Sequence, residues 1–504
     1  MATLQDTQTS GVLPERKIPD NDSSGTSKGS RWTGGQKFAF RVAFIYMLLL
    51  CIPLYARFYE HLFGLEFSRI TYHDFQTVVA FWPPQFVLIE SEEGVFGILN
   101  YINLILGLGI ALVGGAVWTL LDKKTENYSK LYYWTRVLVR YRLAYGMVGW
   151  GLKKAFPMQM VYPTVGMLNT PFVDMAEKKL YWSHVGVSFN YTVFLGFAEI
   201  IPGLLLLHRK TAVLGGALAA VVCFNICIAN HAYDAGVSVP AAYFTILGIF
   251  VMWYDLPKIW KLIAEEKDIA PYRYYPVFNE SWKESLRTGT KFFFNALFVP
   301  VMAAFWAWGF FYGNNYNIPS TPGLADTKGY YEVEEFRLNN ELIPFNPEDS
   351  VRWQDAIFEE WSTLSYKTNR GAIADRMIGY SPLRVRRDKN NTQLNQVDTQ
   401  DSDRLAKANQ NRDLGVTRWE VGGMAGDRRY FFYEADTLRQ VLHLRNKNKN
   451  HRDETQILHY KRPDANRIIL YGINEFNDSI YVVLSRKDKH YPLVEGAQSA
   501  ITAF

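Results

Sequence analysis

Residues 96–121, FGILNYINLILGLGIALVGGAVWTLL, decide the fold class of this chain. The stretch is almost wholly apolar and carries no charge, and ~20 such residues in helical form cross the ~30 Å hydrocarbon core of a bilayer. Comparable segments recur before residue 313 and none follows it. The predicted spans are Phe38–Tyr59, Phe96–Leu121, Tyr132–Phe156, His184–Leu207, Thr211–Ala232, Val239–Leu262 and Lys291–Tyr312. The sequence therefore predicts an α-helical polytopic membrane bundle of about seven transmembrane helices, followed by a soluble domain.

Three regions follow from composition. Residues 1–36 are rich in Ser, Thr, Gly and Asp, and we expect a disordered cytoplasmic arm without a cleavable signal peptide. Residues 37–312 form the membrane domain and residues 313–504 the soluble domain. The net charge of +5 is small for 504 residues, and no basic stripe interleaves with aromatics, so nucleic acid is not an expected partner.

Basic residues in the short loops predict the orientation, because Lys and Arg concentrate on the cytoplasmic side. With seven spans, the loops that carry most of them fall on the side of the N-terminus. These residues are Arg31, Lys37, Arg41, Lys123, Lys124, Lys130, Arg136, Arg209, Lys210, Lys258, Lys261, Lys267, Lys283, Arg287 and Lys291. We expect a multi-pass membrane protein, with the N-terminus cytoplasmic and the C-terminal domain on the opposite side of the membrane.

The soluble domain is predicted to be mostly β, as a sandwich or a small barrel. Short β-branched or aromatic runs are separated by turn residues, which is typical of antiparallel sheet. The predicted strands are Val416–Val421, Tyr430–Tyr433, Gln440–Leu444, Gln456–Tyr460, Arg467–Ile473 and Ser479–Ser485. Trp353–Tyr366 has the apolar spacing of a short amphipathic helix. The domain has no metal-ligand cluster or phosphate loop, so we expect it to bind or pack onto something.

Ionisable residues at membrane depth are costly and mark candidate sites. Glu199 lies among apolar residues near the bilayer middle, and we expect it to be neutral or paired with Arg140 or Arg142. A structural ion pair and a functional proton or ligand site remain equal alternatives. Lys154, at the other end of the same predicted helix as Arg140, snorkels to the interface or acts as a base.

A second polar group lies at the end of the fifth predicted span, with Asn225, His231 and Asp234. His231 and Asp234 are three apart on a helix, a spacing that suits a metal or a His–carboxylate pair. Two ligands are too few for a metal site, so none is predicted. The three cysteines all fall inside predicted spans and are read as buried thiols.

Residues 130–262 resemble the DoxX-like family of four-helix membrane proteins. The matching features are Arg140, the sequence Gly151-Leu152-Lys153-Lys154 before Phe156-Pro157, and Glu199 followed by Pro202-Gly203 and a leucine run. Gly215-Gly216-Ala217 follows a basic turn, and the helix ends in Asn230-His231-Ala232-Tyr233-Asp234. The chain is most similar to a long bacterial subgroup with extra N-terminal helices and a β-rich tail.

The resemblance implies an integral subunit of a larger complex in a bacterial inner (cytoplasmic) membrane, with the C-terminal domain periplasmic. It also implies quinone-linked redox chemistry and other membrane or periplasmic subunits as partners. A dinucleotide fingerprint, a redox Cys-x-x-Cys and a haem-attachment motif are missing from the sequence, so a quinone or a partner would have to carry electrons. Arg140, Glu199, Asn225 and His231 are the candidate cofactor-binding residues, and Lys154, Glu199 and His231 the candidate catalytic ones. The alternatives are a non-catalytic accessory or scaffold subunit and a membrane enzyme that modifies a lipid or polypeptide.

Overall fold

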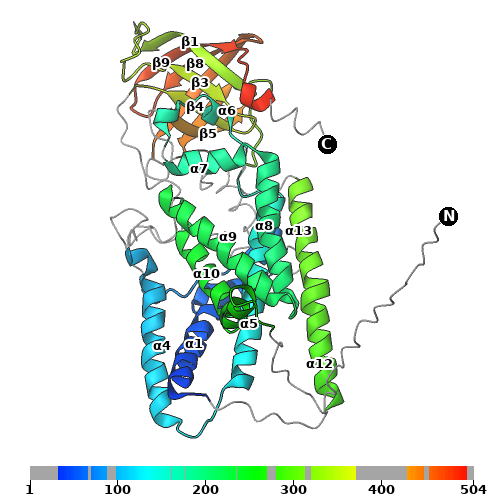
Figure 1. The fold of residues 1–504 in the computed structure, drawn as a ribbon. Helices are drawn as coiled ribbons and strands as arrows, with labels where there is room; N and C mark the ends of the chain where they lie inside the picture. The colour runs from blue at the N-terminus through cyan, green and yellow to red at the C-terminus, as the bar shows by residue number, and fades with distance from the viewer. Residues whose placement is uncertain are drawn as a thin grey trace, which may run out of the picture.

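A helical membrane domain and a β-barrel are stacked end to end (Figure 1). The computed structural model describes residues 32–65, 70–87, 98–160, 162–175, 177–233, 235–268, 280–312, 319–369, 420, 428–447 and 453–495. Most of the predicted N-terminal arm lies outside these residues.

The helices follow one another along the first part of the chain. Those before the fourth predicted span are α1 (Gly34–Cys51), α2 (Ala56–Phe63), α3 (Tyr72–Val79), η2 (Ile98–Tyr101), α4 (Ile102–Leu121), α5 (Ser129–Ala155), α6 (Val165–Leu168), η3 (Phe172–Asp174) and α7 (Glu177–Gly186). The remainder are α8 (Phe189–Leu207), α9 (Ala212–Ala232), α10 (Ser238–Trp253), α11 (Leu256–Ile263), α12 (Ser281–Phe292), η4 (Phe293–Phe298) and α13 (Val299–Phe311).

Five helical stretches in the described residues are long and apolar enough to cross a membrane: Gly34–Cys51, Leu99–Leu121, Phe189–Leu207, Ala212–Ala232 and Ser281–Phe311. The pair α10 and α11 makes a sixth if it is counted as one bent span. Helix α5 is too rich in basic residues to be counted among these stretches, but its 27 residues extend about 40 Å and pack along α8. Each of the seven predicted spans therefore corresponds to a helix.

Two predicted spans end earlier than expected. Helix α1 stops at Cys51 because Pro53 follows, and a proline disfavours helical conformation in the residue before it. Helix α10 stops at Trp253, and α11 leaves it at 67° with Pro257 in its first turn. Between them, Asp255 forms an ion pair with Arg136 of α5, which ties the bend to the bundle.

Helices α5, α8, α9 and α10 form a closed four-helix unit in which each contacts the next and α10 returns to α5. Glycines at the crossings let the backbones approach. A Cβ on Gly151 would lie 2.7 Å from the carbonyl oxygen of Gly196, and one on Gly248 would lie 2.8 Å from that of Gly216. Small residues drive helix association in lipid through such close packing.

The barrel lies at the end of the helical domain opposite the start of α1. Arg41 near the start of α1 donates to the carbonyl of Asp122 after α4, and Phe40 stacks on Tyr128 before α5. The chain then runs along α5 to the segment with α6, which contacts the barrel. The start of α1 and the barrel are therefore at opposite ends of the helical domain.

The soluble domain is an antiparallel eight-stranded barrel that closes through pairing of its first and last strands (Figure 1). Its strands are β1 (Gly329–Leu338), β3 (Asp355–Phe358), β4 (Thr363–Lys367), β5 (Arg428–Asp436), β6 (Val441–Asn446), β7 (Thr455–Asp464), β8 (Arg467–Ile473) and β9 (Ser479–Lys487). The short β2 (Glu341–Leu342) pairs only with β1 among the described strands. Every neighbouring pair is antiparallel, so the predicted antiparallel sheet is confirmed as a barrel.

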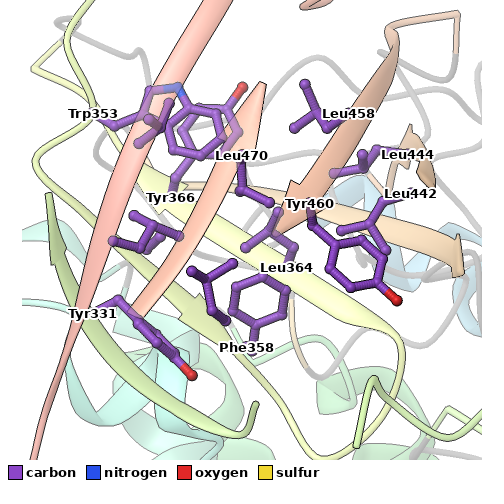
Figure 2. Close-up of a cluster of buried hydrophobic side chains, with 14 of the residues drawn as sticks. Tyr331, Trp353, Phe358, Leu364, Tyr366, Leu442, Leu444, Leu458, Tyr460 and Leu470 are labelled. Atoms are coloured by element: carbon purple, nitrogen blue, oxygen red, sulfur yellow. The ribbon is translucent and has the colours of Figure 1, made fainter. Parts of the chain in front are cut away.

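The barrel interior is filled by its own side chains, as expected for so few strands (Figure 2). The rings of Trp353 and Tyr366 stack with centroids 3.8 Å apart, and Tyr366 also stacks against Phe431. Leucines from β4 and β6 to β8 complete the core. This packing favours a role for the outer surface of the barrel.

The predicted helix over Trp353–Tyr366 is wrong, because this segment forms β3 and β4. All four residues of β3 are buried, so the alternation typical of a strand is missing and the apolar spacing imitates a helix. Strand β1 was not predicted, and the predicted strand Val416–Val421 lies outside the described residues except for Glu420. The other predicted strands correspond to β5 to β9, with Gln440 just before the start of β6.

Candidate functional site

A buried ion pair joins α5 to α8 inside the membrane domain. The Nζ atom of Lys154 lies 2.9 Å from Oε1 and 2.9 Å from Oε2 of Glu199. The Lys154 side chain is 11% exposed and that of Glu199 only 5%. Of the two alternatives for Glu199, a neutral or a paired carboxyl, the structure shows the paired one. The prediction that Arg140 or Arg142 is the partner is wrong, because the partner is Lys154.

Both arginines bind backbone carbonyls instead. Arg140 donates to the carbonyl oxygens of Leu206 and Leu207, at 3.0 and 3.1 Å, where the end of α8 leaves acceptors free. Arg142 donates to the carbonyls of Val79 and Phe81, at 2.9 and 2.7 Å. Their charges thus stabilise a helix end and the segment after α3, and Leu206 is about 10 Å along α8 from Glu199.

A cavity of about 1150 Å³ lies beside the Lys154–Glu199 pair. Helices α5, α7, α8, α9 and α10 and the segment before α7 provide its walls, which are mostly apolar. This volume exceeds the ~300–1,000 Å³ usual for small-molecule pockets. Among its apolar and aromatic lining residues are Met147, Trp150, Leu195, Cys223, Ile226 and Phe244.

Among the described lining residues, Lys154 and Glu199 supply an ammonium and a carboxylate group, and the polar side chains of Gln159, Ser183 and Asn230 also reach the cavity. Trp150 packs against the pair, with the Nζ atom of Lys154 5.8 Å from the ring centroid. Asn225 of α9 and His184 of α7 also line the cavity. The arrangement offers an ammonium donor and a carboxylate acceptor within an apolar slot.

The cavity contains only some of the residues predicted from sequence. Lys154, Glu199 and Asn225 line it, whereas Arg140 and His231 are not among its lining residues. His231 lies on another face of α9, where its Nε2 atom is hydrogen-bonded to the hydroxyl of Tyr101. Asp234, its predicted partner, lies outside the described residues.

The segment between α5 and α7 covers the end of the cavity that faces the barrel. Met160, Met167 and Leu168 of this segment line the cavity from above. We call residues 162–175 the roof. Helix α6 lies within the roof, and the barrel holds it from the other side.

Glu359, which follows β3, binds the roof directly. Its carboxylate accepts hydrogen bonds from the backbone N–H groups of Val165 and Gly166, at 3.1 and 2.7 Å. Lys367 adds an ion pair of 3.0 Å to Asp174, and Asn169 donates to the Tyr491 hydroxyl at 2.7 Å. The barrel and the cavity are thus mechanically connected.

Further ionisable groups lie buried at this junction. Burial and the nearby Glu420 charge raise the pKa of Glu359 to about 7, although the two backbone N–H bonds oppose the rise. Burial lowers the pKa of Lys179 in α7 to about 7, against the attraction of Glu420. Glu420 itself forms an ion pair with Lys447.

Sequence reasoning missed Trp150, the roof and Glu359. Trp150 is one helical turn from Lys154, so the i, i+4 spacing was a usable signal. The contacts between Glu359 and the roof join residues almost two hundred positions apart, and the sequence contains no local signal for them. The described residues contain no group of three or more His, Cys, Asp or Glu arranged to hold a metal ion.

Comparison with known proteins gives little further information. No family model matches the chain, and no solved structure is significantly similar. A protein of Bacillus subtilis (strain 168), described as uncharacterized protein YwoB, is 30% identical over 100 residues. The match covers 19% of this chain, and the chain spans 65% of that relative's length.

Proposed function

We propose that this protein is a DoxX-like, quinone-binding subunit of a larger complex in a bacterial inner membrane. The Lys154–Glu199 pair beside a large apolar cavity is the observation that carries the proposal. Replacing a buried ion pair by apolar residues is often neutral or stabilising, so stability alone gives weak reason to keep one. Ionisable groups at membrane depth are instead usual at functional sites.

The residues present fit a quinone. A quinone ring is apolar and planar, and its carbonyl oxygens accept hydrogen bonds. Lys154 would donate to such an oxygen, Trp150 would pack against the ring, and the apolar walls would exclude water. When bound, the group would supply reversible uptake of two electrons and two protons. Glu199 would accept or return a proton near the head, with Lys154 holding its carboxylate in place.

The orientation of the chain is part of the proposal. The basic loops predicted to be cytoplasmic, such as those with Arg209 and Lys258, are at the end of the bundle away from the barrel. The positive-inside rule then favours a cytoplasmic N-terminus and a periplasmic barrel. Because a filled barrel core has no room for a ligand, we expect its outer surface to bind a periplasmic partner that supplies or accepts electrons.

An accessory role is the second candidate function. In the stretch Ser281–Phe311, only 17% of the most apolar 18-residue segment is buried. Trp308 and Phe311 are exposed on α13. Such a face suits a neighbouring membrane subunit as well as lipid. In that case the protein would copurify with partners but would contain no quinone.

The test is mass spectrometry of small molecules extracted from protein purified gently from its native membrane. We expect a near-stoichiometric quinone in the wild type and its loss in a Lys154→Met/Glu199→Met double variant. The matched control is Arg136→Met/Asp255→Leu, which removes an ion pair of similar geometry, 2.8 Å, away from the cavity. An equal quinone content in all three proteins, or none in any, would refute the proposed function.

A further inference from the structure

The cavity is open on the surface of the helical domain, between α8 and α9. Several lining residues on this side are also substantially exposed: Tyr191 and Phe194 on α8, Val221 and Asn225 on α9, and Tyr233 just after α9. Phe194 is 62% exposed and Val221 68%. A residue that both lines a cavity and faces outward marks its mouth.

The opening follows from the way the two helices pack. At the ends joined by the short turn after α8, a Cβ on Gly215 would lie 2.8 Å from the Leu206 nitrogen and 2.9 Å from the Pro202 carbonyl oxygen. The helices touch there. Toward the barrel the side chains of both helices line the cavity instead, and residues near their other ends, such as Tyr191 and Tyr233, border the mouth.

Lipid is the medium outside this mouth. Exposed apolar side chains surround the mouth on both helices: Phe197, Ile201 and Leu204 on α8, and Leu214, Leu218, Phe224 and Ile228 on α9. Tyr191 and Glu199 are eight residues apart, so the mouth and the ion pair are separated by about 12 Å along α8. The mouth therefore lies in the half of the bilayer nearer the barrel.

The roof covers only part of the aqueous side of the cavity, because Phe172 of the roof and Leu493, which follows β9, line the cavity and are 78% and 50% exposed. Glu359, Lys367 and Tyr491 hold the roof by the contacts described above. A molecule arriving from water would have to pass the segment that these contacts hold, whereas one arriving from lipid would pass between two helices.

We infer that the ligand is a membrane-resident amphiphile with a long hydrocarbon tail, which reaches the Lys154–Glu199 pair sideways from the bilayer between α8 and α9. The inference rests on the proposed function for the nature of the head group and adds the tail and the route. The head meets the ion pair, and the tail remains in the mouth against Phe194 and Val221. The large cavity volume accommodates both parts.

The test compares two probes in vesicles: a quinone with a long isoprenoid tail and its tail-less analogue. Val221→Trp narrows the mouth without altering the ion pair. Leu214→Trp is the matched control, since Leu214 is two helical turns away on the same face of α9, is 55% exposed and does not line the cavity. Blocking contact with two methylene groups of the tail weakens binding by roughly tenfold.

We expect Val221→Trp to weaken binding of the long-tailed probe by that factor while leaving the tail-less probe and the Leu214→Trp protein unchanged. Unchanged binding of the long-tailed probe to Val221→Trp would overturn the lateral route. Equal affinity of the two probes for the wild type would overturn the inference that the ligand's hydrocarbon tail is bound in the mouth. If long-chain phospholipid binds with the same response to Val221→Trp and no quinone binds, the inference stands and the proposed quinone function fails.

Discussion

Removing one member of the Lys154–Glu199 pair should destabilise the protein far more than removing both. At 2.9 Å and an effective dielectric constant of ~20, the attraction between two unit charges is about 6 kcal/mol. Desolvation of both groups offsets most of it, but a single partner left behind has no compensation. We therefore expect Lys154→Met or Glu199→Met alone to cost about 3–5 kcal/mol, and the double variant less than about 1 kcal/mol.

The assay is equilibrium unfolding in mild detergent, followed by circular dichroism for the four proteins of the double-mutant cycle. Arg136→Met provides the comparison. After that change Asp255 still has Lys258 at 3.5 Å as a partner. Arg136→Met should therefore lower the free energy of unfolding less than Lys154→Met does. Single variants within 1 kcal/mol of the wild type, or a double variant whose loss equals the sum of the two single losses, would show that the two charges do not stabilise each other.

Two further predictions concern the roof and the helix crossing. Hydrogen-exchange protection of the backbone amides of residues 162–170, corrected for the intrinsic exchange rate, should fall as the pH rises from 4.5 to about 7. The pKa of Glu359 is raised in the native protein, so ionisation of this carboxyl in that range lowers the stability of the closed state. The protection should recover between pH about 7 and 10.5, because Lys179, whose pKa is lowered, gives up its charge in that range. Protection that does not change with pH would contradict both expectations. Gly151→Ala should lower the free energy of unfolding by about 1–3 kcal/mol, because the added methyl group overpacks α5 against α8. Gly109→Ala, where a Cβ meets open space, should cause no such loss. Equal unfolding midpoints for the two variants would contradict the close crossing.

The helical architecture was predictable because bilayer thickness imposes span length directly on composition. Even α5, with its many basic residues, could be recognised by length and by the apolar residues between Arg142 and Lys153. The ends of the spans were less predictable. Pro53 and Pro257 each stop or redirect a helix that hydropathy alone would continue.

The pairing within the membrane could not be read from sequence. Depth along a helix placed Glu199 near the bilayer middle, but the choice among Arg140, Arg142 and Lys154 depends on which face of α5 meets α8. The contact of Gly151 with Gly196 determines that face. It turns Lys154 toward Glu199 and leaves Arg140 at the carbonyl end of α8.

The barrel shows where strand patterns mislead. In β1 a register shift between Val333 and Glu335 breaks the alternation of buried and exposed residues, so its glutamates read as loop. In β3 complete burial removes the alternation altogether. By contrast, β7 keeps a regular pattern from Gln456 to Tyr460, and the sequence prediction for that segment is correct.

The most direct measurement is a cryo-electron microscopy map of the protein extracted into nanodiscs with its native lipid. We expect elongated density that begins between α8 and α9, passes Phe194 and Val221, and ends within hydrogen-bonding distance of Lys154 and Glu199. A clearly empty cavity, or a ligand held at Arg140 or His231 instead, would contradict it.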